Sequence, residues 1–207
     1  MDTIQSGKTR LSRLIGNELI VVLAGPRTGG NHICNMLLTS INVDSKLSNK
    51  QIYEIYTNPK PKQTFHSQDL KEAQDTIDEL AKFKRAVVPL HIGTLLSKLD
   101  EIKNLFDSVK ILVMEHPYDL KSKSAKRVID NLTYESWYMS EQFQLYNPDV
   151  VEKVTGYPCT GIALNTYHGE NIEDFVDIAS KFLGIEIDKD LCDKIHRIWI
   201  KRVFADI

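Results

Sequence analysis

A glycine-rich stretch that contains one arginine, residues 25–30, reads Gly-Pro-Arg-Thr-Gly-Gly. Glycine allows the backbone to turn tightly and to bring its N–H groups close to an anion. The guanidinium of Arg27 can bind two oxygens of one phosphate or sulfate group. We call residues 25–30 the glycine loop, and we predict that it binds a phosphate- or sulfate-bearing ligand.

The spacing of Gly25 and Gly30 fits the GxxxxG part of a nucleotide-binding P-loop. Asn31 and His32 stand where an ATPase or GTPase has Lys and Ser/Thr, so the hydroxyl that binds magnesium is absent. This difference disfavours a P-loop kinase. The alternative is a tight strand-to-helix turn with a solvated Arg27.

The residues around the glycine loop predict a strand before it and a helix after it. Apolar runs rich in β-branched residues predict four buried strands, at Leu19–Ala24, Ala86–Leu90, Val109–Met114 and Cys159–Leu164. Helical spacing of apolar residues predicts helices after the loop, through Leu95, Leu99, Ile102 and Phe106, over 172–183, and from about Asp188 onward. Asn171 is the expected N-cap of helix 172–183 and Gly184 its C-terminal stop. Residues 44–67 lack a clear period and are typical of a lid loop.

Alternating strands and helices, with strands apolar throughout, predict the α/β class. We expect one P-loop-type domain over residues 1–207, with a parallel sheet flanked by helices on both faces. Ligands of such sheets bind beyond the carboxyl ends of the strands. His32, His91 and His116 follow predicted strands or the glycine loop, and any of the three imidazoles could act as a general base.

Composition bounds the partners and the compartment. The chain has 26 Lys and Arg against 28 Asp and Glu, so its formal net charge is −2, which disfavours nucleic acid as a partner. Its three cysteines lack any CxxC spacing, which argues against disulfides and zinc and favours a reducing compartment. Without a signal peptide or an apolar span, the chain is expected to be cytoplasmic and not in a membrane.

Three motifs resemble the sulfotransferase family. Residues 26–31, Pro-Arg-Thr-Gly-Gly-Asn, resemble the family's 5′-phosphosulfate loop. Residues 110–119, KILVMEHPYD, resemble its second motif, a strand ending in R-[DN]-P-x-D, with Glu115 at the arginine position. The late helix with Lys181-Phe182-Leu183-Gly184 resembles the family's helix ending in FLG.

The resemblance implies sulfuryl transfer from 3′-phosphoadenosine 5′-phosphosulfate to a hydroxyl or amine of a small-molecule or glycan acceptor, without an obligatory metal. It implies that Arg27 stabilises the charge that builds on the leaving phosphate. Thr28 and Asn31 would add side-chain donors and the loop glycines backbone donors. The residues implied to hold the donor here are Pro26, Arg27, Thr28, Gly29, Gly30 and Asn31.

By the same resemblance His91 is the first candidate for the base that deprotonates the acceptor, and Glu115 is the runner-up. Ser122, Lys123 and Ser124 lie in a basic stretch that could hold the 3′-phosphate or could be a solvated helix face. The main alternative function is a catalytically degenerate P-loop protein that binds a phosphate-bearing ligand. A small-molecule kinase ranks below both.

Overall fold

Four parallel strands form the sheet at the centre of the molecule, in the order β2-β1-β3-β4. The computed structural model describes residues 16–25, 29–42, 80–81, 84–115, 146–163 and 172–204. The strands are β1 (Glu18–Leu23), β2 (Arg85–Leu90), β3 (Ser108–Glu115) and β4 (Cys159–Ala163). Each lies within a residue or two of its predicted position.

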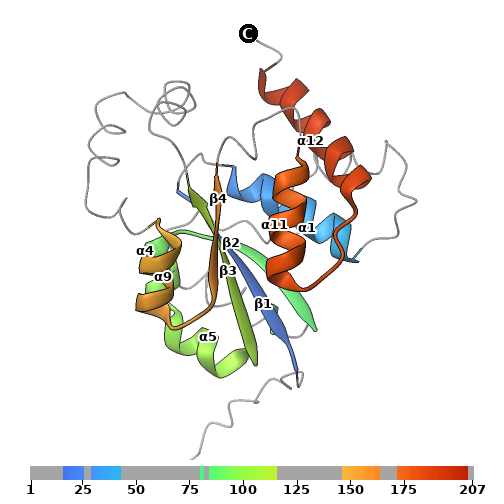
Figure 1. Cartoon of the computed structure of the whole chain (residues 1–207). Coiled ribbons are helices and arrows are strands. Elements are labelled where there is room, and N and C mark those ends of the chain that lie inside the picture. The colour runs from blue at the N-terminus through green and yellow to red at the C-terminus, as the bar shows by residue number, and fades with distance from the viewer. Residues whose placement is uncertain are drawn as a thin grey trace, which may run out of the picture.

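The central strand is apolar from residue 19 to residue 23 because both faces of the sheet are covered. Residues 19–23 of β1 are fully buried, as expected for a central strand of a parallel sheet. Helices α1 (Gly30–Asn42), α11 (Glu173–Leu183) and α12 (Lys189–Phe204) lie on one face. Helices α4 (Ile92–Ser97), α5 (Leu99–Leu105) and α9 (Pro148–Thr155) lie on the other (Figure 1).

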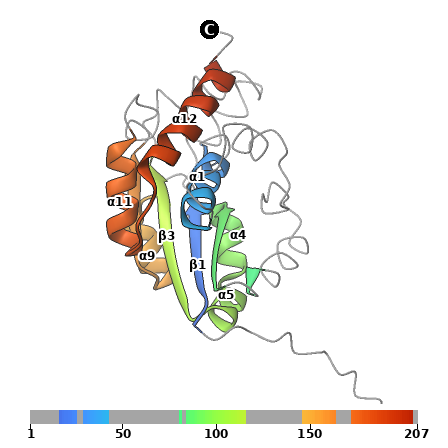
Figure 2. The same ribbon diagram turned by 90° about the vertical axis from the view of Figure 1, so that its right-hand side faces the viewer.

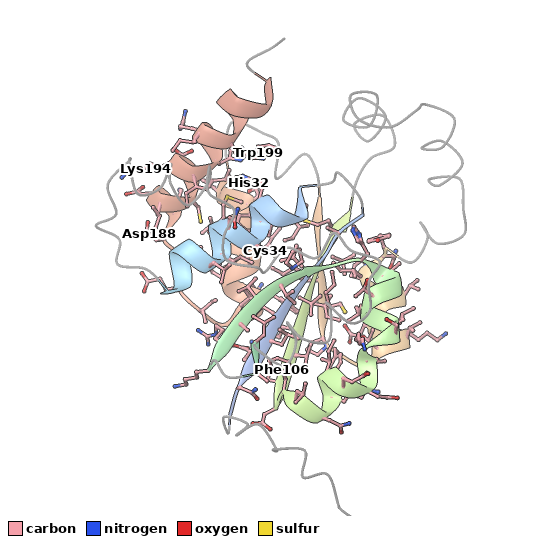
Figure 3. The ribbon with its side chains drawn as sticks, turned by 180° about the vertical axis from the view of Figure 1, so that it is seen from behind. His32, Cys34, Phe106, Asp188, Lys194 and Trp199 are labelled. Atoms are coloured by element: carbon pink, nitrogen blue, oxygen red, sulfur yellow. The ribbon has the colours of Figure 1, made fainter. Side chains whose placement is uncertain are left out.

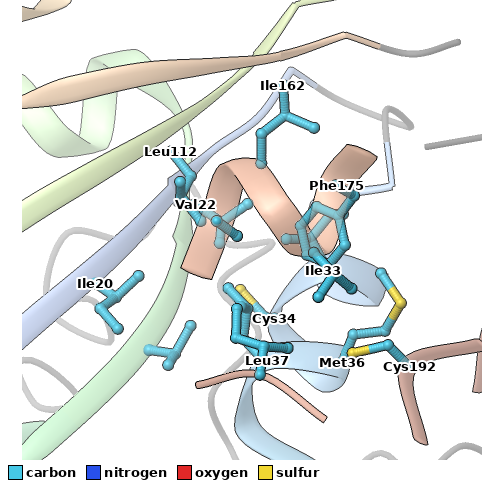
Figure 4. Close-up of a cluster of buried hydrophobic side chains, with 14 of the residues drawn as sticks. Ile20, Val22, Ile33, Cys34, Met36, Leu37, Leu112, Ile162, Phe175 and Cys192 are labelled. Carbon is cyan, nitrogen blue, oxygen red and sulfur yellow. The ribbon is translucent and has the colours of Figure 1, made fainter. Parts of the chain in front are cut away.

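Alternate side chains along the strands belong to two separate hydrophobic cores, one on each face of the sheet. Ile20, Val22 and Leu112 join the core beneath α1, α11 and α12, which Figure 4 shows around Ile33 and Phe175. Leu19, Val21 and Ile111 join the core beneath α4, α5 and α9. Figure 2 shows α12 crossing over α1, and the two helices are in contact.

The predicted α/β architecture, a parallel sheet with helices on both faces, is confirmed by these layers. Among the described residues no helix is both long enough and apolar enough to cross a membrane. Because all four strands are parallel, the sheet has an amino edge, where the strands begin, and a carboxyl edge, where they end. The two edges hold different kinds of polar residue.

The amino edge is closed by a buried asparagine. Asn17 is fully buried, and its side-chain amide donates to the carbonyls of Ala81 (3.2 Å) and Leu105 (2.9 Å). Its Oδ1 accepts from the backbone N–H of Asp107 at 3.1 Å. The asparagine thus ties three chain segments together and leaves no side-chain group unsatisfied.

Charged side chains complete the amino edge. One carboxylate oxygen of Glu18 lies 2.6 Å from Nε of Arg85, and the other lies 3.4 Å from Nζ of Lys110. The three residues come from neighbouring strands, since Glu18 pairs in register with Arg85 on one side and with Ser108 on the other. Opposite charges on adjacent strands fix the register there.

Three details of the helices differ from the sequence prediction. The helix expected through Leu95 to Phe106 is two short helices that meet at Lys98, whose φ of −114° is not helical. The hydroxyl of Ser97 donates to the carbonyl of Thr94 at 2.9 Å, which offers the backbone a local alternative at the break.

The N-cap of α11 is Ile172, not Asn171, which lies outside the described residues. The C-terminal stop at Gly184 is confirmed, with φ of 69° in the left-handed region. Helix α9 was missed by the sequence analysis, although Asn147 caps it, Pro148 starts it and Gly156 ends it.

Candidate functional site

The glycine loop begins where β1 ends, at the carboxyl edge of the sheet. The N–H of Ala24 donates to the carbonyl of Leu90 at 3.1 Å, so the β1–β2 pairing continues to the edge of the loop. At the far end Gly29 has φ of 86°, a left-handed conformation that side chains rarely adopt. The carbonyl of Gly29 accepts from the N–H groups of His32 (2.9 Å) and Ile33 (3.1 Å), which makes it the start of α1.

Gly30 allows α1 to approach the end of β1 closely. A Cβ added at Gly30 would lie 2.6 Å from Cβ of Ala24, closer than real side chains come. The helix start therefore packs directly on the strand end, and only glycine fits there without movement. The N–H groups of Gly30 and Asn31 precede the first intrahelical bonds, and the helix start carries a partial positive charge.

The glycine loop lies where the order of the strands changes direction along the chain. From β1 the chain goes to β2 on one side and afterwards to β3 on the other side of β1. Connections leave the two strands in opposite directions at such a switch point, which opens a crevice beyond the carboxyl ends. Leu23 pairs with Val113, so the backbone of Glu115 lies at the carboxyl edge on the β3 side, two positions farther along.

His91 lies on the β2 side of the loop. It is the N-cap residue of α4, with extended φ and ψ of −87° and 155°, and its ring is partly exposed. Nδ1 lies 2.8 Å from the carbonyl oxygen of Ala24, which can only accept. Nδ1 therefore carries the proton in the neutral ring, and the lone pair is on Nε2.

Tyr146 is a site residue that the sequence analysis missed. Its hydroxyl lies 3.4 Å from the carbonyl oxygen of Ala24 and accepts the N–H of Ile92 at 3.3 Å. Burial raises the pKa of Tyr146 to about 12, so the hydroxyl keeps its proton at neutral pH. The only sequence signal was its place directly before the Asn-Pro start of α9.

His32 is not at the site, contrary to its place among the three candidate bases. Its side chain is buried between α1 and α12, with Nε2 at 3.3 Å from Nδ1 of His196. Its ring stacks on that of Trp199 with centroids 4.5 Å apart, and Figure 3 shows the pair. Trp199 itself is partly buried and packs against the core beneath α1, α11 and α12.

Several predicted site residues are only partly described. For Asn31 and Glu115 the structure describes the backbone, in α1 and at the end of β3. The segment 44–67 lies outside the described ranges. So do the remaining predicted site residues and the third candidate histidine, which are Pro26, Arg27, Thr28, His116, Ser122, Lys123 and Ser124.

The three cysteines are free thiols. Burial raises the pKa of the Cys34 thiol, and burial together with the charge of Glu152 raises that of Cys159 to about 12. Thiolates are therefore scarce at neutral pH, and neither residue is an activated nucleophile. Within the described part of the chain, no group of three or more His, Cys, Asp or Glu side chains could hold a metal ion.

The site thus belongs to an α/β protein with a glycine turn at the switch point of a parallel sheet. No known family model matches the chain, and no curated protein matches it significantly.

Proposed function

We propose that the glycine loop binds a phosphate- or sulfate-bearing nucleotide. The observation that carries this proposal is the contact between Gly30 and Ala24, which requires glycine at the start of α1. It brings the N–H groups of the helix start beside the carboxyl end of β1, where anions bind in parallel sheets. Arg27 would add a positive charge from the same loop.

The reaction that this site supports best is sulfuryl transfer from 3′-phosphoadenosine 5′-phosphosulfate to a hydroxyl or amine of a small-molecule or glycan acceptor. The acceptor attacks sulfur, the bond from sulfur to the bridging phosphate oxygen breaks, and 3′-phosphoadenosine 5′-phosphate leaves. Nε2 of His91 takes the acceptor's proton. The loop N–H groups and Arg27 stabilise the charge on the leaving phosphate.

His32 favours sulfuryl transfer over phosphoryl transfer. P-loop kinases bind magnesium with a hydroxyl directly after the loop lysine. Here that position is a histidine whose ring is buried against Trp199 and His196. We therefore expect nucleotide binding and turnover to be independent of magnesium, and a strict magnesium requirement would favour a kinase instead.

The hydrogen bond that holds the His91 ring on the carbonyl of Ala24 makes His91 the preferred base over Glu115. His91→Asn keeps a side-chain N–H that can donate to Ala24 but removes the titrating nitrogen. We expect this variant to lower kcat about a hundredfold with nucleotide affinity nearly unchanged. A loss of kcat of that size in Glu115→Gln, with kcat of His91→Asn close to that of wild type, would assign the base to the carboxylate.

Glu115 supports the second candidate function, an anion-binding protein without catalysis. It stands at the arginine position of the resembled motif, and a carboxylate about 4 Å from a 3′-phosphate would cost on the order of 4 kcal/mol at an effective dielectric near 20. We expect wild type to prefer adenosine 5′-phosphosulfate over the 3′-phosphorylated form, and Glu115→Arg to reverse that preference. Calorimetry with both nucleotides and both variants isolates this contact.

Tight binding of the 3′-phosphorylated form by wild type, with no gain in Glu115→Arg, would show that another group meets the 3′-phosphate. Ser122, Lys123 and Ser124 are the candidates.

We place the protein in the cytoplasm, which the three free thiols support.

A further inference from the structure

The hydroxyl of Tyr146 joins two backbone groups that both belong to the setting of His91. It lies within hydrogen-bond distance of the Ala24 carbonyl, at 3.4 Å, and accepts the N–H of Ile92 at 3.3 Å. Ala24 ends the central strand, whereas Ile92 begins α4. Tyr146 itself comes from a third segment, directly before the N-cap of α9.

Both groups act directly on the histidine. The carbonyl of Ala24 is the same acceptor that His91 Nδ1 approaches at 2.8 Å. Ile92 is the next residue after His91. A hydrogen bond to its N–H therefore holds the peptide plane that includes Cα of His91. One hydroxyl therefore touches the backbone that holds the ring and the acceptor that orients it.

We propose that Tyr146 is a positioning residue for His91, which orients the imidazole with its proton on Nδ1 and its lone pair on Nε2. The inference rests on the proposed role of His91 as the base. The hydroxyl gives its own proton to the second lone pair of the Ala24 carbonyl while it accepts from Ile92, so donors and acceptors match.

The environment of Tyr146 suits this task. The side chain is buried in the core beneath α4 and α9, so the hydroxyl has few alternatives in water. Its hydrogen bonds to Ala24 and Ile92 are long, so each of these two stabilises the fold weakly. Loss of the hydroxyl is therefore expected to release the histidine ring more than it destabilises the protein.

Tyr157 offers a matched control at the other end of α9. Its hydroxyl is also buried, but it has no hydrogen-bond partner among the described residues. Its ring packs against the same core as Tyr146. Tyr157→Phe and Tyr146→Phe each remove one buried hydroxyl beside this core, and only the second removes contacts to the surroundings of His91.

The test is the tautomer of His91, read by NMR from long-range proton–nitrogen correlations of the imidazole in protein with labelled histidine. Wild type and Tyr157→Phe are expected to show the Nδ1–H tautomer in the neutral ring. Tyr146→Phe is expected to show a mixture of both tautomers, with Tm within about 4 °C of wild type.

A neutral wild-type ring protonated on Nε2, or identical His91 signals in all three proteins, would overturn the proposal. The measurement needs no ligand, so it is independent of the proposed reaction. If the reaction is also correct, Tyr146→Phe lowers kcat about tenfold with nucleotide affinity unchanged. Failure to bind any nucleotide, with the tautomer result intact, would contradict the proposed function and leave the positioning role standing.

Discussion

The two edges of the parallel sheet hold polar residues of opposite character. At the amino edge, Asn17 is fully buried and its amide satisfies three backbone groups. At the carboxyl edge, Gly29 and Gly30 shape a turn that starts a helix, and a partly exposed His91 stands beside it. The amino edge joins chain segments, whereas the carboxyl edge presents backbone donors and an imidazole ring.

The difference separates stability from ligand binding in one small sheet. Groups of the amino edge bind one another, so their removal leaves buried partners unsatisfied. Groups of the carboxyl edge lie where ligands of parallel sheets usually bind, so we expect their removal to change what binds there. Variants at the two edges are therefore expected to fall into two classes, one with lower stability and one with weaker ligand binding.

The largest effect is expected at the amino edge. Asn17→Ala removes three hydrogen bonds and leaves two carbonyls and one N–H without this partner in the interior. We expect a loss of about 3 kcal/mol in the free energy of unfolding. Urea unfolding measures it, with nucleotide affinity of the folded fraction unchanged. A loss below about 1 kcal/mol would mean that water replaces the amide.

The next effect combines both classes. Gly30→Ala places a Cβ 2.6 Å from that of Ala24, so α1 must move away from β1. We expect a loss of about 2 kcal/mol in stability, typical of overpacking, and at least about tenfold weaker nucleotide binding.

Gly93→Ala is the control for this substitution. It lies inside α4, and a Cβ added there meets nothing within 4 Å. We expect it to stabilise the protein by about 0.5–1 kcal/mol, the usual gain for alanine over glycine in a helix, with unchanged affinity. Equal losses of stability and affinity in Gly30→Ala and Gly93→Ala would mean that the close approach of Gly30 to Ala24 is not their cause.

A third prediction tests the loop cation. Arg27→Ala is expected to weaken nucleotide binding by about 1.5–3 kcal/mol with no change in the free energy of unfolding, as for a lost hydrogen bond to a charged group. Lys at this position is expected to restore part of the affinity, because it returns the charge without the bidentate geometry. An unchanged dissociation constant in Arg27→Ala would place the arginine outside the site.

The smallest effect is expected from the amino-edge ion pairs. Glu18→Gln removes the carboxylate that lies between Arg85 and Lys110, all three partly exposed. We expect a loss of about 0.5 kcal/mol in stability, which shrinks at high salt because exposed charges are screened. Guanidinium chloride hides such a term, so urea at two salt concentrations is the appropriate assay.

The sequence predicted the fold well because each strand contains a run of apolar residues. Residues 19–23 contain no polar residue, and the parallel sheet they implied is confirmed. The break between α4 and α5 was missed because the apolar period continues across it, while the interruption comes from local bonds at Ser97 and Lys98.

The candidate site was predictable only in part. The glycine turn after β1 and the place of His91 beside it followed from strand ends alone. The same rule misplaced His32, since residue type does not distinguish a ring facing a crevice from one stacked on Trp199. Tyr146 approaches Ala24 across 122 positions of the chain, a contact that no local pattern encodes.

Backbone NMR during titration with adenosine 5′-phosphosulfate, the nucleotide that wild type is expected to prefer, tests the proposed nucleotide site most directly, because it reads both edges of the sheet at once. We expect the largest amide shift changes at Gly29, Gly30 and His91, in the loop and at the end of β2. The amides of Asp107 and Ser108, which bond to Asn17 at the amino edge, stay unchanged. Saturable binding with its shifts at the amino edge, or no shifts at all at millimolar nucleotide, would contradict it.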